Sequence, residues 1–421
     1  MKVYKGVLRM RLGDVVLSRG GSFEIVDGVY YVGVKDWSRR LFDSLILLPK
    51  GTSYNAYLVM GSEKVALIDT VNPGFEGMLE DRIREVVDPR GIDYVVMNHA
   101  EPDHAGAVPY VLNIAPKAKL ITTSVGLKMA KIFYGVPMER VHVVRDGDVI
   151  SLGLKTLKFI EAPMLHWPET MFTFLDEDGI LFSCDFFGSH IAEGMFDDEV
   201  EDIINHAQRY WAEIMMPFRS SALRALEKIS KLDIKIIAPS HGPVYRNPKK
   251  ILSKYFEWAQ GKTAEKVSIV YTSMWGYTEK VVRLMENTFI EQGIHTVVHN
   301  LAYADLGDVA KDLTDSTALI LATPTVIGFA HPLMMQVTYL AKLLKPPVKY
   351  VGLVIIYAWG TNADKQLSDA LRELGVEIVD VVKINVTPTG DDVRRVKELA
   401  IKISQKVKEL GSSRSFSKYL R

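Results

Sequence analysis

The sequence predicts an α/β protein of two units: a sheet-rich sandwich of strands and helices, followed by a doubly wound parallel sheet. Up to about residue 260, short apolar runs separated by turns are mixed with helical patterns, which is typical of a sandwich. After Gly261 and Lys262, strands and helices alternate regularly, as parallel sheets with crossover helices require. We therefore place the units at residues 1–262 and 263–410, with a flexible tail at 411–421.

The elements of the first unit are predicted from apolar periodicity. Strands are short apolar runs bounded by turns, and helices show apolar residues three and four positions apart. The expected strands are residues 54–59, 65–69, 94–97, 155–160, 171–175, 180–183 and 234–238. The expected helices are residues 74–87, 105–114, 125–134, 222–229 and 248–259.

The second unit shows the strongest alternation of strands and helices. Its five strands are expected at residues 267–271, 296–300, 318–322, 350–356 and 381–386. Its helices are expected at residues 278–292, 332–344, 363–374 and 391–410. Five apolar strands separated by helices indicate a doubly wound parallel sheet.

Composition excludes several classes of protein. The chain has 421 residues and one cysteine, Cys184, so no intramolecular disulfide, cysteine-ligated iron–sulfur cluster, rubredoxin-type iron or four-cysteine zinc site is possible within it. Its 51 basic and 51 acidic residues cancel, which argues against nucleic-acid binding. No apolar run reaches the length of a membrane span, and residues 1–11 lack the features of a signal peptide. We expect a cytoplasmic protein without a membrane or nucleic-acid partner.

A cluster of metal-ligating residue types follows the apolar run 94–97. His99, Glu101, Asp103 and His104 fall within six residues, and this spacing lets one segment offer ligands to two adjacent ions. Three further residues of ligand type each follow a strand-like run, where α/β sheets build their sites. They are His166, Asp185 and His241. The remaining histidines are expected to be ordinary surface or core residues: His142, His190, His206, His295 and His299.

A hydroxyl-rich loop joins the first strand and first helix of the second unit. Thr272, Ser273 and Thr278 flank Gly276 there, and amides at a helix N-terminus favour an anion. The loop lacks the Gly-Lys-Ser/Thr of a nucleotide-triphosphate loop and the G-x-G-x-x-G of a dinucleotide site. An ordinary capped turn is the alternative. Loops 323–328 and 357–361 follow the third and fourth strands, and Trp359 offers either a stacking face or a core side chain.

The His-x-Glu-x-Asp-His segment resembles the metallo-β-lactamase superfamily signature, in which the second position is His. Glu101 at that position makes the site harder and more anionic, which suits iron better than zinc. The segment also resembles the flavodiiron branch, as do the runs 166–172 and 181–188. The resemblance covers the chain from about Phe23 to the final helix. It implies a metallo-β-lactamase-like αββα sandwich followed by a flavodoxin-like parallel sheet of five strands.

The resemblance also implies ligands and cofactors. His99, Glu101 and His166 would hold one iron, Asp103, His104 and His241 the other, and Asp185 would bridge them. Asp69 is expected to be structural. The second unit would bind FMN through its three loops, with the following residues around the cofactor: Thr272, Ser273, Met274, Trp275, Gly276, Tyr277, Thr278, Pro324, Thr325, Val326, Gly328, Ala358, Trp359 and Gly360.

The expected function is that of an oxidoreductase that reduces O2 to water, NO to N2O, or both, with FMN passing electrons to the two irons. The donor would be a rubredoxin-like protein or reduced deazaflavin coenzyme, and the assembly a head-to-tail homodimer or a dimer of dimers. Two alternatives are a dinuclear zinc hydrolase and an FMN electron carrier without terminal reductase activity. The chain departs from the family at Cys184, where Asn is common, and at residues 41–45, where some members carry His-Gly-Tyr.

Overall fold

The computed structural model describes residues 21–418. The segment 1–11, predicted to carry no signal peptide, lies outside the described residues. Within the described part, no helix is both long and apolar enough to cross a bilayer.

Two mixed sheets form the middle of the first unit. The first sheet has the order β1 (Phe23–Val26), β2 (Val29–Tyr31), β7 (Tyr57–Met60), β8 (Val65–Ile68), β9 (Tyr94–Val96), β10 (Lys119–Thr122) and β11 (Val141–Val143). The second has the order β12 (Val149–Ser151), β13 (Thr156–Glu161), β14 (Met171–Leu175), β15 (Ile180–Cys184) and β16 (Ile236–Pro239). Two short pairs lie apart from them: β3 (Val34–Asp36) with β6 (Thr52–Tyr54), and β4 (Leu41–Phe42) with β5 (Ile46–Leu47).

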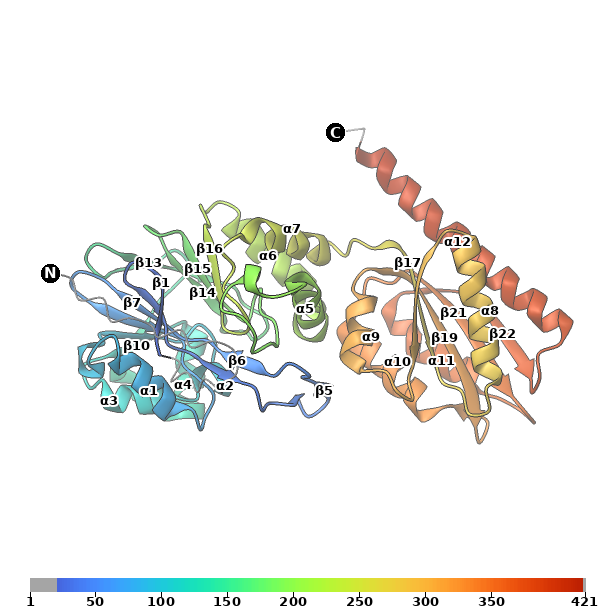
Figure 1. Cartoon of the computed structure of the whole chain (residues 1–421), viewed down its shortest axis with the longest axis horizontal. Helices are drawn as coiled ribbons and strands as arrows, with labels where there is room; N and C mark the ends of the chain where they lie inside the picture. Colours follow the sequence, from blue (N-terminus) through green and yellow to red (C-terminus); the bar gives the residue numbers. More distant parts are fainter. Residues whose placement is uncertain (1–20, 419–421) are drawn as a thin grey trace, which may run out of the picture.

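Helices cover the outer faces of both sheets (Figure 1). Against the first sheet pack α1 (Glu76–Arg84), α3 (Val108–Ile114) and α4 (Ser124–Tyr134), with the short α2 (Pro102–Ala105) at its edge. Against the second pack α5 (Ile203–Tyr210), α6 (Arg219–Ile229) and α7 (Pro248–Ala259). Between the sheets, Tyr57 and Ile68 of one meet Phe159 and Phe182 of the other. The predicted αββα sandwich is confirmed.

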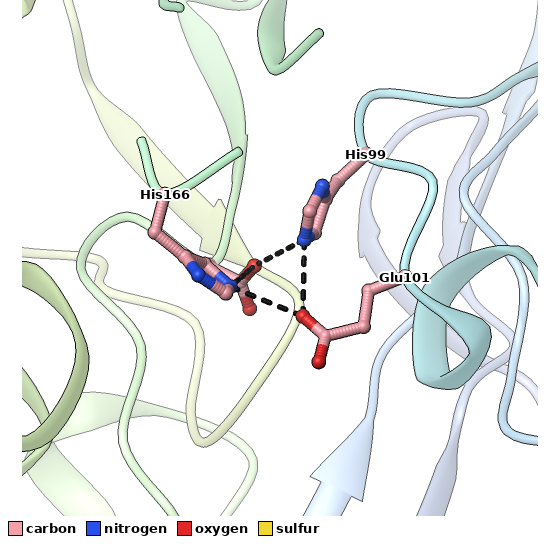
Figure 2. A group of neighbouring side chains, drawn as sticks. His99, Glu101 and His166 are labelled. Carbon is pink, nitrogen blue, oxygen red and sulfur yellow. Dashed lines mark hydrogen bonds and ion pairs between the residues drawn. The ribbon is translucent and has the colours of Figure 1, made fainter. Parts of the chain in front are cut away.

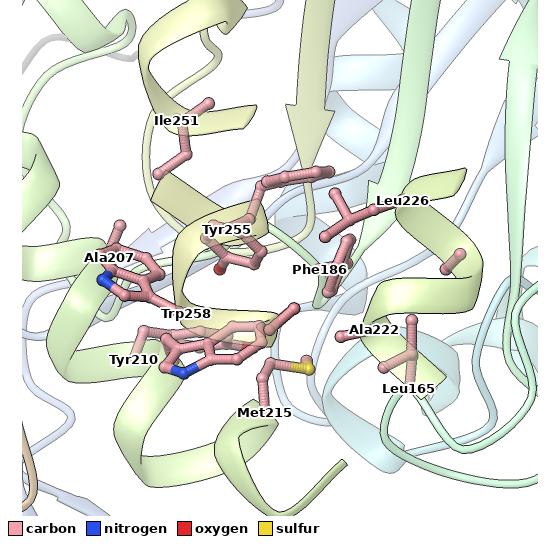
Figure 3. Close-up of a cluster of buried hydrophobic side chains, with 14 of the residues drawn as sticks. Leu165, Phe186, Ala207, Tyr210, Met215, Ala222, Leu226, Ile251, Tyr255 and Trp258 are labelled. Atoms are coloured by element: carbon pink, nitrogen blue, oxygen red, sulfur yellow. The ribbon is translucent and has the colours of Figure 1, made fainter. Parts of the chain in front are cut away.

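The helical layer on the second sheet contains an irregular segment. A π-helical turn, Trp211–Met215, and a 3₁₀ turn, Met216–Phe218, join α5 to α6. Tyr210, the last residue of α5, and Met215, the last residue of the π-helical turn, are buried with side chains of α6 and α7 (Figure 3). Insertions of this kind occur frequently at functional sites.

The second unit is a parallel sheet with helices on both faces. Its order is β18 (His295–Asn300), β17 (Ala264–Tyr271), β19 (Ser316–Val326), β21 (Tyr350–Tyr357) and β22 (Glu377–Asn385). One face is covered by α8 (Tyr277–Glu291) and α12 (Gly390–Lys418), the other by α9 (Leu306–Leu313), α10 (Pro332–Leu344) and α11 (Ala363–Leu371). This strand order is that of flavodoxins, so the predicted five-stranded sheet is confirmed. A short strand β20 (Phe329–Ala330) pairs with the end of β19.

The structure also contains elements that the sequence did not predict. The strands β1 to β5 and β10 to β12, of two to four residues each, were not predicted. Helices α5 and α9 were missed too, and the run 54–59, predicted as one strand, is divided between β6 and β7. Helix α12 continues to Lys418, so its predicted end at Leu410 is wrong. The flexible tail at residues 411–421 stays a prediction. Residues 419–421 lie outside the described part, and the unit boundary at residues 262 and 263 stays a prediction.

The two units meet where α9 lies against α5 and the π-helical turn. Gly307, in the first turn of α9, is the point of closest approach. A Cβ atom there would overlap the carboxylate of Glu213 and the guanidinium of Arg209. A side chain at this position would therefore force the paired side chains of Arg209 and Glu213 to move.

We predict that Gly307→Ala lowers the free energy of unfolding by about 1–3 kcal/mol, because the added methyl group displaces the paired side chains of Arg209 and Glu213. The midpoint of urea unfolding measures this. Gly77→Ala in α1 is the matched control, since nothing lies within 4 Å of its added Cβ. Equal midpoints for the two variants would contradict the tight seam.

Candidate functional site

The seven predicted metal-ligating residues come together at one rim of the sandwich. His99 follows β9, Asp185 follows β15 directly, and His241 follows β16. Strands β8 and β9 are parallel, and so are β15 and β16, so their carboxyl ends can face one another across the sandwich. The chain thus gathers, at one place, residues that are more than 140 positions apart at the extremes.

The first ligand group is formed by His99, Glu101, His166 and one oxygen of Asp185 (Figure 2). Glu101 Oε2 lies 3.1 Å from the Nε2 atoms of both His99 and His166. Asp185 Oδ2 lies 3.4 Å from His99 Nε2 and 3.5 Å from His166 Nε2. Two imidazoles and two carboxylates therefore point at one small volume.

The second ligand group is formed by Asp103, His104 and His241. His241 Nε2 lies 3.3 Å from Asp103 Oδ2, and His104 Nε2 lies 3.4 Å from Asp103 Oδ1. The other oxygen of Asp185, Oδ1, lies 3.0 Å from His104 Nε2 and 3.4 Å from His241 Nε2. Asp185 thus presents one oxygen to each group, which is the geometry of a bridging ligand.

Opposite charges hold the carboxylates of the site in their ionised form. Burial would raise the pKa of Asp185, but the imidazoles of His104 and His166 hold it well below its ordinary value. Burial would lower the pKa of His241, but hydrogen bonds to Asp103 and Asp185 raise it to about 10. Ionised carboxylates are the form that binds cations.

The unsatisfied atoms of this cluster fit a pair of metal ions. Both ring nitrogens of His104, Asp103 Oδ1 and Asp185 Oδ2 are buried and make no hydrogen bond. Burying several polar atoms without hydrogen bonds is unfavourable, so these atoms require another binding partner. Four imidazoles and three carboxylates in two adjacent groups form a donor set that suits two iron ions.

Buried hydrogen bonds orient the ligands from behind. Glu169 Oε1 lies 2.7 Å from His99 Nδ1 and accepts from the Ala100 amide at 2.8 Å. Asp69 accepts from the backbone and side-chain amides of Asn98, at 2.8 and 2.9 Å. Asp69 belongs to neither ligand group and fixes the residue before His99, which agrees with the structural role expected for it.

A cavity of about 200 Å³ opens onto the metal ligands. Glu101, Asp103 and His241 form its floor, and the tip of the β4–β5 hairpin contributes Phe42 and Asp43. This opening would let a small substrate reach the metal centre.

Sequence reasoning missed two residues near the metal cluster. His190, expected to be ordinary, lines the cavity, with Nδ1 3.0 Å from the Thr52 hydroxyl. The phenolic hydroxyl of Tyr210 donates a hydrogen bond to Asp185 Oδ1 at 2.8 Å. No signal in the sequence marked either residue, because each acquires its role from packing between distant segments.

The three loops predicted to bind FMN converge at the carboxyl end of the second sheet. They enclose a cavity of about 200 Å³. Its walls include Met274, Trp275, Tyr277, Thr278, Pro324, Thr325, Ala358 and Trp359 from the predicted set, together with Ile356, Tyr357 and Val386, which were not predicted. The Asn362 amide donates to the Gly328 carbonyl at 2.7 Å and thereby holds the second and third loops together.

The first loop fits a bound phosphate. The hydroxyl oxygens of Thr272 and Ser273 are buried without a hydrogen-bond partner. Gly276, with φ at +79°, precedes α8 and supplies no side-chain cap, so the amides of the first helical turn remain open to an anion. Trp275 and Trp359 are 80% and 86% exposed beside the cavity, where an aromatic ring system could stack on them. These residues fit FMN.

Comparison with known sequences places the chain among redox enzymes. Residues 52–242 match the model of the ODP family beta lactamase. A nitric oxide reductase of Moorella thermoacetica is 36% identical over 393 residues, which cover 91% of this chain and 98% of the relative. A coenzyme F420H2 oxidase of Methanocaldococcus jannaschii is 34% identical over 406 residues, which cover 92% of this chain and 97% of the relative.

Two solved structures share the whole architecture. The rubredoxin oxygen:oxidoreductase of Desulfovibrio gigas superposes with a TM-score of 0.88 at 32% identity, covering 92% of this chain and 99% of that chain. The flavodiiron protein of Giardia intestinalis superposes with a TM-score of 0.88 at 29% identity, covering 92% of this chain and 97% of that chain. Both units of this chain are therefore found together in solved proteins.

We predict that Glu169→Gln weakens iron binding by about tenfold, because the buried carboxylate that orients His99 loses its charge. Competition with a chelator, read as iron retained per chain, measures this change. Glu63→Gln, on an exposed loop, is the control and should retain iron as the unchanged protein does. Equal retention by both variants would show that Glu169 does not support the metal.

We predict that Thr272→Val weakens FMN binding by about tenfold, since it removes a buried hydroxyl placed to donate to a charged phosphate. Fluorescence titration of the flavin-free protein with FMN measures the dissociation constant. Thr288→Val makes the same change in α8, where the hydroxyl bonds only the Leu284 carbonyl among described groups. If both variants bind FMN equally, the first loop does not hold the phosphate.

Proposed function

This chain belongs to the flavodiiron protein family, and from that premise we propose that it reduces O2, NO or both at a two-iron centre fed by FMN. The relatives named above act in both ways: one is named a nitric oxide reductase and another an oxygen oxidoreductase. The chain is an oxidoreductase, and the zinc hydrolase and simple electron carrier are not favoured.

The observation that carries the proposal is the placement of Asp185 between the two ligand groups. Its Oδ2 lies within 3.5 Å of two imidazole nitrogens of the first ligand group, and its Oδ1 lies within 3.5 Å of two imidazole nitrogens of the second. Glu101 adds a second carboxylate to the first group. Histidine and carboxylate ligands combined in one site are typical of non-haem iron, whereas imidazole alone suits several metals, zinc among them.

The chain's own residues bind, orient and shelter the reacting centre. Bound there, the irons and the flavin would supply the redox chemistry, in which four electrons and four protons turn O2 into two waters, or two of each turn two NO into N2O and water. Glu169 orients His99, and the Tyr210 phenol holds one oxygen of Asp185. Phe42 and the ring of His190, 5.0 Å apart, wall the cavity above the second ligand group.

The electron donor and the assembly follow from the same proposal. A rubredoxin-like protein or reduced deazaflavin coenzyme would reduce the flavin, because the one cysteine of this chain cannot form a rubredoxin site. We propose a head-to-tail homodimer, supported by exposed apolar side chains at both cavities. Trp275 and Trp359 lie beside the flavin cavity, and Leu45 and Leu47 lie on the β4–β5 hairpin, whose Phe42 and Asp43 line the metal cavity. The cytoplasmic location stays a prediction.

The proposal predicts fast reoxidation of the reduced flavin. The protein, loaded with iron and FMN and reduced without air, is mixed with O2 or NO while flavin absorbance is followed. Reoxidation should be faster than that of free FMN with at least one of the gases, and O2 should yield water with little hydrogen peroxide.

The control for that experiment is the double variant His99→Ala, Asp185→Ala, which removes metal ligands and leaves the flavin cavity intact. It should keep FMN yet reoxidise slowly and form hydrogen peroxide. Reoxidation of the unchanged protein at the rate of free FMN, with both gases, would refute terminal reductase activity.

A further inference from the structure

Two consecutive residues of α5 face the two parts of the molecule that must act together. Arg209 faces the seam with the second unit, and Tyr210 points into the metal centre. The side chains of successive helical residues point about 100° apart, so one helical turn can direct one side chain to the seam and the next to the metal centre. The π-helical turn Trp211–Met215 begins immediately after them.

Arg209 joins three separate segments through one guanidinium group. Its Nε donates to Glu213 at 2.9 Å, and its Nη1 donates to Asp308 at 3.1 Å. Its Nη2 donates to Asp305 and to the Leu47 carbonyl, both at 2.7 Å. The guanidinium thus binds the π-helical turn, the start of α9 in the second unit, and the end of β5.

One of the segments that Arg209 joins lines the metal cavity, and the residue next to Arg209 contacts the metal centre. The β4–β5 hairpin, held at Leu47, carries Phe42 and Asp43 on the cavity wall. Tyr210, the next residue, is 1% exposed and donates to Asp185 Oδ1 at 2.8 Å. Because both the hairpin and the phenol depend on one helical turn, the anchoring of that turn decides where both lie.

We propose that Arg209 is a positioning residue, which fixes the Tyr210 phenol on Asp185 and couples that contact to the placement of the FMN-binding unit. The inference rests on the proposed function in taking the cluster as a metal centre. A planar guanidinium suits this role, because its fixed fork of donors holds several acceptors in one geometry, whereas a lysine offers a single point charge.

A purely structural role for Arg209 would give a different result. The side chain is only 14% exposed and pairs with three carboxylates, so its loss would loosen the seam in either case. Only a positioning role predicts that substituting Arg209 displaces Tyr210 and thereby alters the spectrum of the metal ions. The test must therefore compare Arg209 variants with a Tyr210 variant.

The experiment measures the Mössbauer and visible spectra of the iron-loaded, FMN-loaded protein and of Arg209→Gln, Tyr210→Phe and the double variant. We expect both single changes to perturb the same iron signal, and the double variant to add nothing further. Each single substitution should lower kcat about tenfold and leave KM nearly unchanged. Arg209→Lys should perturb the iron signal less than Arg209→Gln does.

Gln208→Ala is the matched control, since Gln208 is the preceding residue and its side chain also reaches the second unit, donating to the Lys311 carbonyl at 3.3 Å. It should leave the spectra unchanged. Spectra of Arg209→Gln identical to those of the unchanged protein, or additive effects in the double variant, would overturn the proposal. The visible spectra of the same variants loaded with cobalt in place of iron do not depend on O2 or NO turnover, so failure of the proposed function would be seen separately.

Discussion

The whole metal centre depends on one buried carboxylate that serves two ligand groups. Asp185 is 2% exposed, and its two oxygens face different pairs of imidazoles. An isolated carboxylate in such a place would be expensive to ionise, but the surrounding imidazoles hold its pKa far below the ordinary value. The remaining ligands are arranged around this shared group, so any element that moves Asp185 moves both halves of the centre.

The fold supplies this arrangement through the ends of its strands. Asp185 follows β15, which pairs in parallel with β16, and His241 follows β16. On the opposite sheet, β8 and β9 bring Asp69 behind the segment that carries His99. The core between the two sheets fixes the distance between these rims. The irregular turn after α5 then brings a phenol to Asp185 and a guanidinium to the second unit.

Much of this could be predicted from the sequence, for identifiable reasons. Four of the proposed ligands lie within six residues, and the other three follow apolar strands, so local order alone was enough to propose them. The parallel sheet was predictable because its strands are long, apolar and regularly spaced. His190, Tyr210 and Arg209 could not be found in this way, because their contacts join segments that lie far apart in the chain. Their neighbours are determined by packing, which leaves no local pattern.

The central claim is that two carboxylate-bridged irons and one flavin occupy the two cavities. Metal and flavin analysis of the protein, purified without added metal, tests it most directly. The account predicts two irons and one FMN per chain, with Mössbauer spectra showing magnetic coupling between the irons. Two zinc ions per chain without iron, or two uncoupled irons, would contradict the bridging role of Asp185.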